Sequence, residues 1–282
     1  RLSLANKIDI KKDKYLNQLI KKTILNIPID NFEGFKEMSR ILKVNRINKK
    51  PKVILTTNGF YASSLKAKYI IDCISNGAKL ILMQHGGNKN HHKISFTDNF
   101  EIDVSDKYCT WGWKKDYKKK IVPLGINKDL SQINNGSNKN TNLLFIVKSC
   151  KRFSKYLDYD NCPKLNYHYY KNFCVDFYRH LKPNFQKKMI FRLHTKSWDE
   201  LKFFKKKCSG ADFSDRKKEK FEKVVKKSQL AICSYLGTTF LELMASNIPV
   251  ILTTSSPIYI YNKDTVDLLK ILEKYKIFFN DK

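Results

Sequence analysis

Alternating stretches of apolar and polar positions predict short buried strands separated by amphipathic helices. Residues 52–57 and 79–84 are apolar runs of strand length. Between them, apolar side chains recur at helical spacing over residues 63–76, and Asn76-Gly77 is a typical helix end. Strand, helix and strand in this order form a βαβ unit, so the pattern predicts a parallel sheet.

The same pattern returns after residues 126–141, a polar segment rich in Asn, Gly and Ser. Strands are predicted at 143–147, 189–194, 230–235 and 249–254, and helices at 165–182, 197–207, 216–228, 239–246 and 264–275. We therefore expect two α/β domains, residues 1–130 and 131–282, each a Rossmann-like parallel sheet, facing one another across a cleft. The first domain is expected to be incomplete, because the chain begins at Arg1 rather than at Met.

Composition narrows the class of protein. Hydrophobic residues make up 42% of the 282 positions, which predicts packed cores rather than disorder. No apolar run approaches the roughly 20 residues that span a bilayer, and the polar N-terminus does not resemble a signal peptide. The seven cysteines include no CxxC pair, so neither a disulfide framework nor a zinc site is expected. These features favour a cytoplasmic protein without a resident metal or cofactor.

The formal charge of +29 invites a nucleic-acid interpretation, but the residue types weaken it. Only seven of the 55 cations are arginine, the residue that makes bidentate contacts with phosphates and bases. The lysines are spread along the whole chain. We expect a solvated basic surface first, contact with an anionic membrane or a polyanionic substrate second, and specific nucleic-acid binding last.

Ligands of parallel sheets bind beyond the carboxyl ends of the strands, so the residues at those ends are candidates for chemistry. Gln84 ends the first such strand, and His85, Gly86 and Gly87 follow it. Glycines allow the backbone to approach a ligand, and an imidazole can take a proton from a hydroxyl nucleophile near neutral pH. The alternative is a Gly-Gly turn with an incidental histidine.

Asp106, Trp111 and Trp113 surround a further short apolar stretch at 107–111. The two indoles could stack on a sugar or a base, or they could pack in a core. Asp106 could instead cap a turn. We take all three as candidates for an acceptor side, together with the loop that begins at Gln84.

Two stretches of the second domain suit an anion. The first is Arg192, His194 and Lys196 at the end of the strand 189–194. Its alternative is an exposed edge strand with polar side chains.

The second stretch places Gly237, Thr238 and Thr239 between a strand and a helix. Helix-terminal N–H groups and the helix dipole favour a phosphate there, and the hydroxyls add donors. Thr239 and Glu242 also match a capping box, which alone would explain both residues. It would not explain Ser234, Gly237 or Thr238.

The order and spacing of these stretches resemble a family of transferases encoded in O-antigen and other surface-polysaccharide gene clusters. The resemblance covers about residues 51–280 and rests on PKVILTTNGF, GAKLILMQHGG, SDKYCTWGW, VPLG, FRLH and SYLGTTFLELMASNIPVIL. That family is similar to the two-domain glycosyltransferases of the GT-B type. More distantly it resembles CDP-glycerol glycerophosphotransferases and bacterial Kdo and sialic-acid transferases.

The resemblance implies a role for each candidate. His85 would be the catalytic base, and Glu242 would reach a ribose or only cap its helix. Implied ligands of the donor phosphate are Arg192, His194, Ser234, Thr238 and Thr239. The implied reaction moves a glycosyl or glycerophosphoryl group from a nucleotide sugar or CDP-alcohol to a glycan or lipid-linked glycan. Lysine and arginine would neutralise the phosphate without a metal.

Two other functions stay open at this point. One is a nucleotide-sugar epimerase on the same scaffold, and the other is a non-enzymatic module that binds polyanions or nucleic acid. The transferase interpretation predicts a cytoplasmic enzyme, peripheral to the inner face of the plasma membrane.

Overall fold

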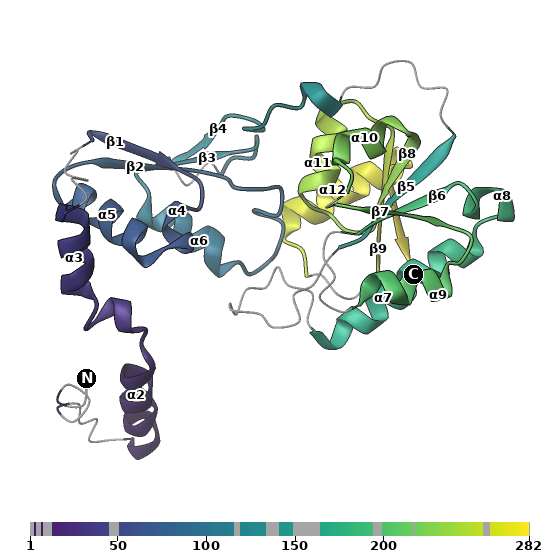
Figure 1. Ribbon diagram of the computed structural model, residues 1–282. Helices are drawn as coiled ribbons and strands as arrows, with labels where there is room; N and C mark the ends of the chain where they lie inside the picture. Colours follow the sequence, from purple (N-terminus) through teal and green to yellow (C-terminus); the bar gives the residue numbers. More distant parts are fainter. Residues whose placement is uncertain are drawn as a thin grey trace. The chain divides into compact units, whose positions relative to one another are not determined.

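Figure 1 shows the computed structural model of the chain. It describes residues 13–44, 51–115, 119–133, 141–148, 164–193, 199–216, 218–255 and 260–281, with Ser3 and Lys7. The chain forms two compact units, Arg1–Met83 with Val104–Tyr108, and Gln84–Asp103 with Cys109–Lys282. The predicted cleft and the predicted boundary after residue 130 stay predictions.

The first unit begins with helices and continues into a βαβ unit. Its elements are α2 (Lys14–Asn26), a 3-10 turn (Ile29–Asn31), α3 (Phe35–Val44), β1 (Val53–Thr56), α4 (Gly59–Ala62), α5 (Ser64–Ser75) and β2 (Lys79–Met83). β1 and β2 pair in parallel, with Val53 opposite Lys79 and Thr56 opposite Leu82. The predicted βαβ unit is therefore confirmed.

Two further strands extend this first sheet. They are β3 (Lys107–Thr110) and β4 (Ile121–Pro123), and the strand order is β1-β2-β3-β4. The helix α6 (Phe96–Val104) precedes β3 in the chain.

The second sheet has six strands in the order β10-β9-β8-β5-β6-β7, and all five neighbouring pairs are parallel. Its strands are β5 (Asn142–Ile146), β6 (Met189–Leu193), β7 (Asp212–Asp215), β8 (Ser228–Cys233), β9 (Val250–Ser255) and β10 (Phe278–Asp281). Its helices are α7 (Lys164–His180), α8 (Pro183–Gln186), α9 (Glu200–Lys207), α10 (Phe221–Lys226), α11 (Thr238–Ala245) and α12 (Lys263–Lys274), and a 3-10 turn (Ser131–Ile133) precedes β5.

Helices cover both faces of this sheet (Figure 1). Leu144 and Ile146 of β5 pack in one core with side chains of α10, α11 and α12. Leu143 and Phe145 point the other way, into a core with α7 and α9. Burial on both faces explains why the strands are continuous apolar runs. An α/β fold with two parallel-strand sheets is thus confirmed.

The hydrophobic pattern missed or misplaced several elements of the second sheet. β7 and β10, with the sequences DFSD and FFND, are its two edge strands, where polar side chains are tolerated because one side of the strand is not covered. The helix predicted over 216–228 is the shorter α10. β8 begins at Ser228 rather than at residue 230. The hydrophobic pattern missed its first two residues because they are polar.

Candidate active site

The turn between β8 and α11 is held by close contacts of Gly237. This residue is the N-cap of α11, and no side chain caps the helix. A Cβ atom at Gly237 would lie 2.5 Å from Asn88 Oδ1 and 2.6 Å from Tyr235 Cε2. The capping box predicted for Thr239 is therefore wrong, because Thr239 lies inside the first turn.

The Gly86-Gly87 pair packs directly on the start of α11. The N–H of Gly87 donates a hydrogen bond of 2.9 Å to Thr238 Oγ1. A Cβ atom at Gly87 would stand 2.7 Å from Thr238 Cα and 2.8 Å from Thr238 N, and one at Gly86 would stand 2.8 Å from Thr238 Oγ1. Only residues without a side chain permit this approach. This close packing explains why the loop has two glycines, whereas a turn alone would need only one.

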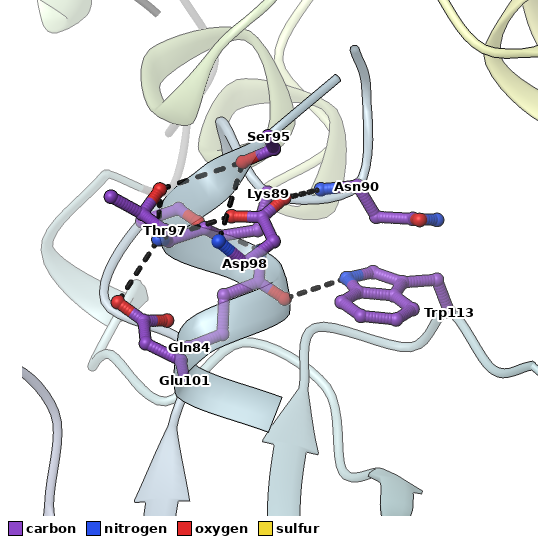
Figure 2. A network of polar contacts seen from close by, with 9 residues as sticks. Gln84, Lys89, Asn90, Ser95, Thr97, Asp98, Glu101 and Trp113 are labelled. Atoms are coloured by element: carbon purple, nitrogen blue, oxygen red, sulfur yellow. Dashed lines mark hydrogen bonds and ion pairs between the residues drawn. The ribbon is translucent and has the colours of Figure 1, made fainter. Parts of the chain in front are cut away.

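Gln84 fixes the other end of the same loop. Its side chain is almost fully buried, and its Nε2 donates to the carbonyl of Gly86 at 2.7 Å. Its Oε1 accepts from the backbone N–H of Trp111 at 2.9 Å. The same oxygen accepts from the indole N–H of Trp113 at 2.8 Å (Figure 2). One amide therefore joins three of the predicted site residues, and His85 is exposed between its fixed neighbours.

A buried ion cluster follows the loop, and the sequence analysis missed it (Figure 2). Lys89 Nζ lies 3.1 Å from Asp98 Oδ1 and 3.0 Å from Glu101 Oε1, and the three side chains are only 15%, 8% and 3% exposed. Asp98 Oδ2 also accepts from the N–H of Asn90 at 2.7 Å, where Asn90 has a φ of 60°. The sequence held one indication of this cluster. Lys89 is followed by two acidic residues, Asp98 and Glu101, which are three positions apart and therefore lie on the same side of α6.

The charge of Lys89 is held by its two carboxylates. Burial opposes the charge, but Glu101 and Asp98 outweigh it, so the pKa of Lys89 lies above its ordinary value. A lysine that stays charged at every physiological pH makes this cluster a structural clamp rather than a proton donor.

A second tie joins the loop to the start of α12. Asn262 caps that helix by accepting from Thr265 N at 2.9 Å, and its Nδ2 donates to the carbonyl of Asn90 at 2.7 Å. The rings of His92 and Tyr261 stack with centroids 5.8 Å apart. The segment after β2 is therefore fastened at the N-termini of two helices, α11 and α12.

Glu242 forms an ion pair with Lys128 from the segment predicted to be a linker. Lys128 Nζ lies 5.7 Å from the ring of Trp111, whose indole N–H donates to Asn127 Oδ1 at 2.9 Å. The interpretation of Glu242 as a cap of its own helix is wrong, because α11 already begins at Thr238 and has no side-chain cap.

Arg192 and Ser234 lie deeper than the sequence suggested. A guanidinium nitrogen of Arg192 donates to Ser214 Oγ at 2.6 Å, and burial lowers the pKa of Arg192 while nearby Glu219 opposes that shift. The hydroxyl of Ser234 is fully buried and donates to the carbonyl of Ile146 at 2.7 Å. Its only hydrogen is therefore used inside the fold.

The family is identified over the whole chain. Residues 1–282 match the family model described as LIC12162 family transferase. The chain belongs to the LIC12162 family of transferases. The predicted transferase class is confirmed, while the donor and the acceptor stay predictions.

Comparisons with curated proteins and with solved structures say less about this transferase than the family model does. No curated protein matches it. Among solved structures it is similar to MurG of Acinetobacter baumannii, with 10% sequence identity and a TM-score of 0.45. The match covers 86% of this chain and 62% of MurG, so the transferase chain spans less than two thirds of the length of that protein.

The remaining predicted residues of the transferase lie apart from this site or outside the described residues. Asp106 Oδ2 accepts from the N–H of Leu80 at 2.8 Å, near the start of β2, whereas the loop follows the end of that strand. We therefore leave Asp106 out of the site. His194 and Lys196 fall outside the residues that the structure describes.

Two absences hold for the described part of the transferase. None of its helices there combines the length and the apolar character needed to cross a bilayer. No group of three His, Cys, Asp or Glu side chains in those ranges could hold a metal ion.

Proposed function

We propose that this transferase moves a glycosyl or glycerophosphoryl group from a nucleotide-activated donor to a hydroxyl of a surface-polysaccharide acceptor. One observation carries the proposal. The loop with the exposed imidazole of His85 is hydrogen-bonded, through Gly87, to the first residue of α11. A base and a helix N-terminus thus stand within one short piece of structure, and group transfer from a phosphate ester needs both.

The proposed role of His85 is to remove the proton of the acceptor. In the glycosyl case, the acceptor oxygen bonds to the anomeric carbon while its proton passes to an imidazole nitrogen. The bond between that carbon and the donor phosphate oxygen breaks, and its electron pair leaves with the nucleotide. In the glycerophosphoryl case the acceptor oxygen attacks phosphorus instead, and CMP leaves.

The proposed role of α11 is to bind the departing phosphate. The N–H groups of its first turn have no partner within the helix, and the helix dipole favours an anion there. Thr238 Oγ1 accepts from Gly87, which leaves its own hydrogen able to bind a phosphate oxygen. Thr239 adds a second hydroxyl in that turn. Phosphate binding by Arg192, His194 and Lys196 stays a prediction.

Trp111 and Trp113 are proposed to serve the acceptor. Gln84 holds the backbone of Trp111 and the indole of Trp113, and Asn127 accepts from the indole of Trp111, so both rings are held beside the loop of His85. Fixed aromatic rings are suited to stacking on sugars. We further propose that cationic side chains rather than a metal neutralise the phosphate. The charge of +29 supports peripheral contact with the anionic inner face of the plasma membrane.

Thermal unfolding with CMP, CDP, UDP, GDP and their sugar or alcohol derivatives tests this function. A true donor at 100 times its Kd should stabilise the fold by about 2.7 kcal/mol through mass action. Mass spectrometry with the stabilising donor and a polysaccharide acceptor should then show an acceptor of increased mass. A converted donor of unchanged mass would favour the epimerase. If no compound in the panel stabilises the protein, the proposed donor class is wrong.

A further inference from the structure

The helices on the two faces of the six-stranded sheet differ in the charges that they expose. On one face, α12 exposes three lysines and three acids, and Lys270 pairs there with Asp267. On the other face lie α7 and α9, and α8 connects α7 to β6. Along these three helices seven cations are exposed, namely Arg179, Lys182, Lys187, Lys202, Lys205, Lys206 and Lys207. We call these seven residues the basic patch.

Carboxylates of the described residues do not neutralise the basic patch. In the described parts of the segment 167–211, the exposed acids are Asp176 and Asp199. Glu200, at the start of α9, is buried and accepts from the hydroxyl of Tyr167 at 2.9 Å. Within the ranges that the structure describes, no ion pair joins a residue of the basic patch to an acid. The charges of the patch are therefore available to a partner.

The helices α7 and α9 lie side by side (Figure 1). The Nζ of Lys171 on α7 lies 5.6 Å from the centroid of the Tyr167 ring on the same helix and 4.6 Å from that of the Phe203 ring on α9. A Cβ atom at Gly210, just after α9, would stand 2.8 Å from the hydroxyl of Tyr178 near the end of α7. The C-terminal turns of the two helices, which carry four of the seven patch residues, are therefore neighbours.

These helix ends lie at the edge of the sheet where its strands begin. The chain passes from α7 through α8 into β6, and from α9 into β7. β6 and β7 run in parallel with Ile190 opposite Asp212, so both start at the same edge. The helix α11 instead follows the end of β8, which runs parallel to β6 through β5. The patch is thus at the opposite edge from the helix terminus proposed to bind the donor phosphate, and the donor does not use its charges.

The composition of the basic patch suits lipid headgroups better than nucleic acid. Six of its seven residues are lysines, whose compact charge attracts phosphate but lacks the bidentate geometry that distinguishes bases. Clusters of about four to eight cations are typical of contacts with anionic membranes. Phe185 is exposed between Lys182 and Lys187, and aromatic side chains are suited to the headgroup region. An acceptor glycan has to reach the reacting groups, whereas a bilayer can bind a distant edge of the sheet.

We propose that the basic patch binds the anionic headgroups of a phospholipid bilayer and holds the transferase at the membrane surface. This inference rests on the peripheral membrane contact proposed above, because it names the surface that makes the contact. The probes are vesicles of phosphatidylglycerol and phosphatidylcholine in equal parts, and vesicles of phosphatidylcholine alone. The full chain should sediment with the anionic vesicles and not with the neutral ones. The bound fraction should fall as salt is added, because salt screens exposed charges.

Two variants of the basic patch test the proposal. The triple variant Lys205→Gln, Lys206→Gln and Lys207→Gln should weaken binding to the anionic vesicles by about 100-fold, because each cation near a membrane surface contributes about 5-fold. The double variant Lys182→Gln and Lys187→Gln, outside α9, should weaken it by about 25-fold for the same reason. The double variant decides if the triple variant does not fold, which urea unfolding shows.

The matched control removes the same charge from the other face of the sheet. It is the triple variant Lys263→Gln, Lys270→Gln and Lys274→Gln, at exposed positions of α12. Its net charge equals that of the α9 variant, but its lysines stand among acids. This control should bind the anionic vesicles nearly as the parent protein does.

The outcomes separate this inference from the proposed transfer chemistry. Equal losses in the α9 and α12 variants would show that net charge alone attracts the protein, and would overturn the role of the patch. A parent protein that does not bind anionic vesicles overturns it as well. Binding to a soluble acidic polysaccharide or to duplex DNA, but not to the vesicles, would overturn the assignment to a membrane. The vesicles contain neither nucleotide nor acceptor, so each of these failures leaves the transfer reaction standing.

Discussion

The backbone N–H of Gly87 donates a hydrogen bond of 2.9 Å to the hydroxyl of Thr238, which lies 151 positions further along the chain. This bond joins the loop after β2 to the first residue of α11. It forms only because neither Gly86 nor Gly87 carries a side chain, since a Cβ at either position would stand less than 3.0 Å from Thr238. The proposed chemistry depends on this one contact.

The stability lost in Gly86→Ala and in Gly87→Ala should respond differently to a second change, Thr238→Ala. Gly86→Ala and Gly87→Ala should each destabilise the fold by about 1–3 kcal/mol, the usual cost of overpacking. Thr238→Ala should rescue Gly86→Ala, because among the described residues, chain neighbours aside, Thr238 Oγ1 is the one atom within 4 Å of the added Cβ. It should not rescue Gly87→Ala, whose Cβ meets the backbone of residue 238. Urea unfolding of the single and double variants measures the cycle.

Equal rescue of the two alanine variants would contradict this assignment of the contacts. So would a Gly87→Ala variant as stable as the parent protein. The single variant Thr238→Ala supplies the baseline for both comparisons, because it also removes the acceptor of the Gly87 N–H.

Lys89→Met should be severely destabilising. It leaves the carboxylates of Asp98 and Glu101 buried without their cation, and breaking a buried ion pair from one side typically costs about 3–5 kcal/mol. Lys270→Met is the control, because the Lys270–Asp267 pair is 70% and 52% exposed and such pairs contribute about 0–1 kcal/mol. Chemical denaturation of both variants at neutral pH tests the difference, and similar losses would contradict the buried clamp.

The contribution of Lys89 should also depend on pH in a defined direction. Because its pKa is raised in the folded protein, its stabilisation is complete below the ordinary lysine pKa of about 10.4 and is lost as the pH rises through the folded value. The difference in unfolding free energy between the parent protein and Lys89→Met should therefore be constant around neutrality. It should shrink in strongly alkaline solution, and a difference that grows there would contradict the ion pair.

Gln84→Leu should loosen both tryptophans at once. It removes the acceptor of two part-buried N–H groups, and each hydrogen bond of this kind typically contributes about 0.5–1.5 kcal/mol. Trp113→Phe removes only the indole donor and leaves the bond from Trp111 to Gln84 in place. Its loss of hydrogen-bond free energy should therefore be smaller. The indole N–H resonance of Trp113 should shift in Gln84→Leu, and an unchanged resonance would show that the amide does not bind it.

His85→Gln should abolish transfer while leaving donor binding intact. General-base catalysis typically contributes about 10²–10⁴-fold, so the turnover should fall by that factor once a substrate pair is in hand. The nucleotide-induced rise in melting temperature should stay the same. His168→Gln, on the exposed side of α7, is the matched control and should keep full activity. Full activity in His85→Gln would remove the base assignment.

Much of the fold could be predicted because it depends on local pattern. The apolar runs at 79–84 and 143–147 became β2 and β5, and helical spacing placed α5 and α12 within a few residues. The edge strands β7 and β10 could not be found this way. Their sequences are only four residues long and carry polar side chains, so they form strands by pairing with a buried neighbouring strand.

The candidate site was only partly accessible to the same reasoning. Position after a strand singled out the loop at Gln84 and the turn at Gly237, since both follow from periodicity. The ion cluster of Lys89 does not follow from periodicity. The spacing of Asp98 and Glu101 was its one trace in the sequence, and a charged side chain in a sequence is ordinarily exposed.

The sequence by itself determined the class of fold and the transferase family, since strand and helix periodicity and the order of motifs are written along the chain. Only the tertiary structure decided which distant groups meet. The contact of Gly87 with Thr238 and the pairing of Glu242 with Lys128 depend on how the strands, loops and helices of the fold align with one another. That alignment is set by packing of whole elements, and no local pattern encodes it.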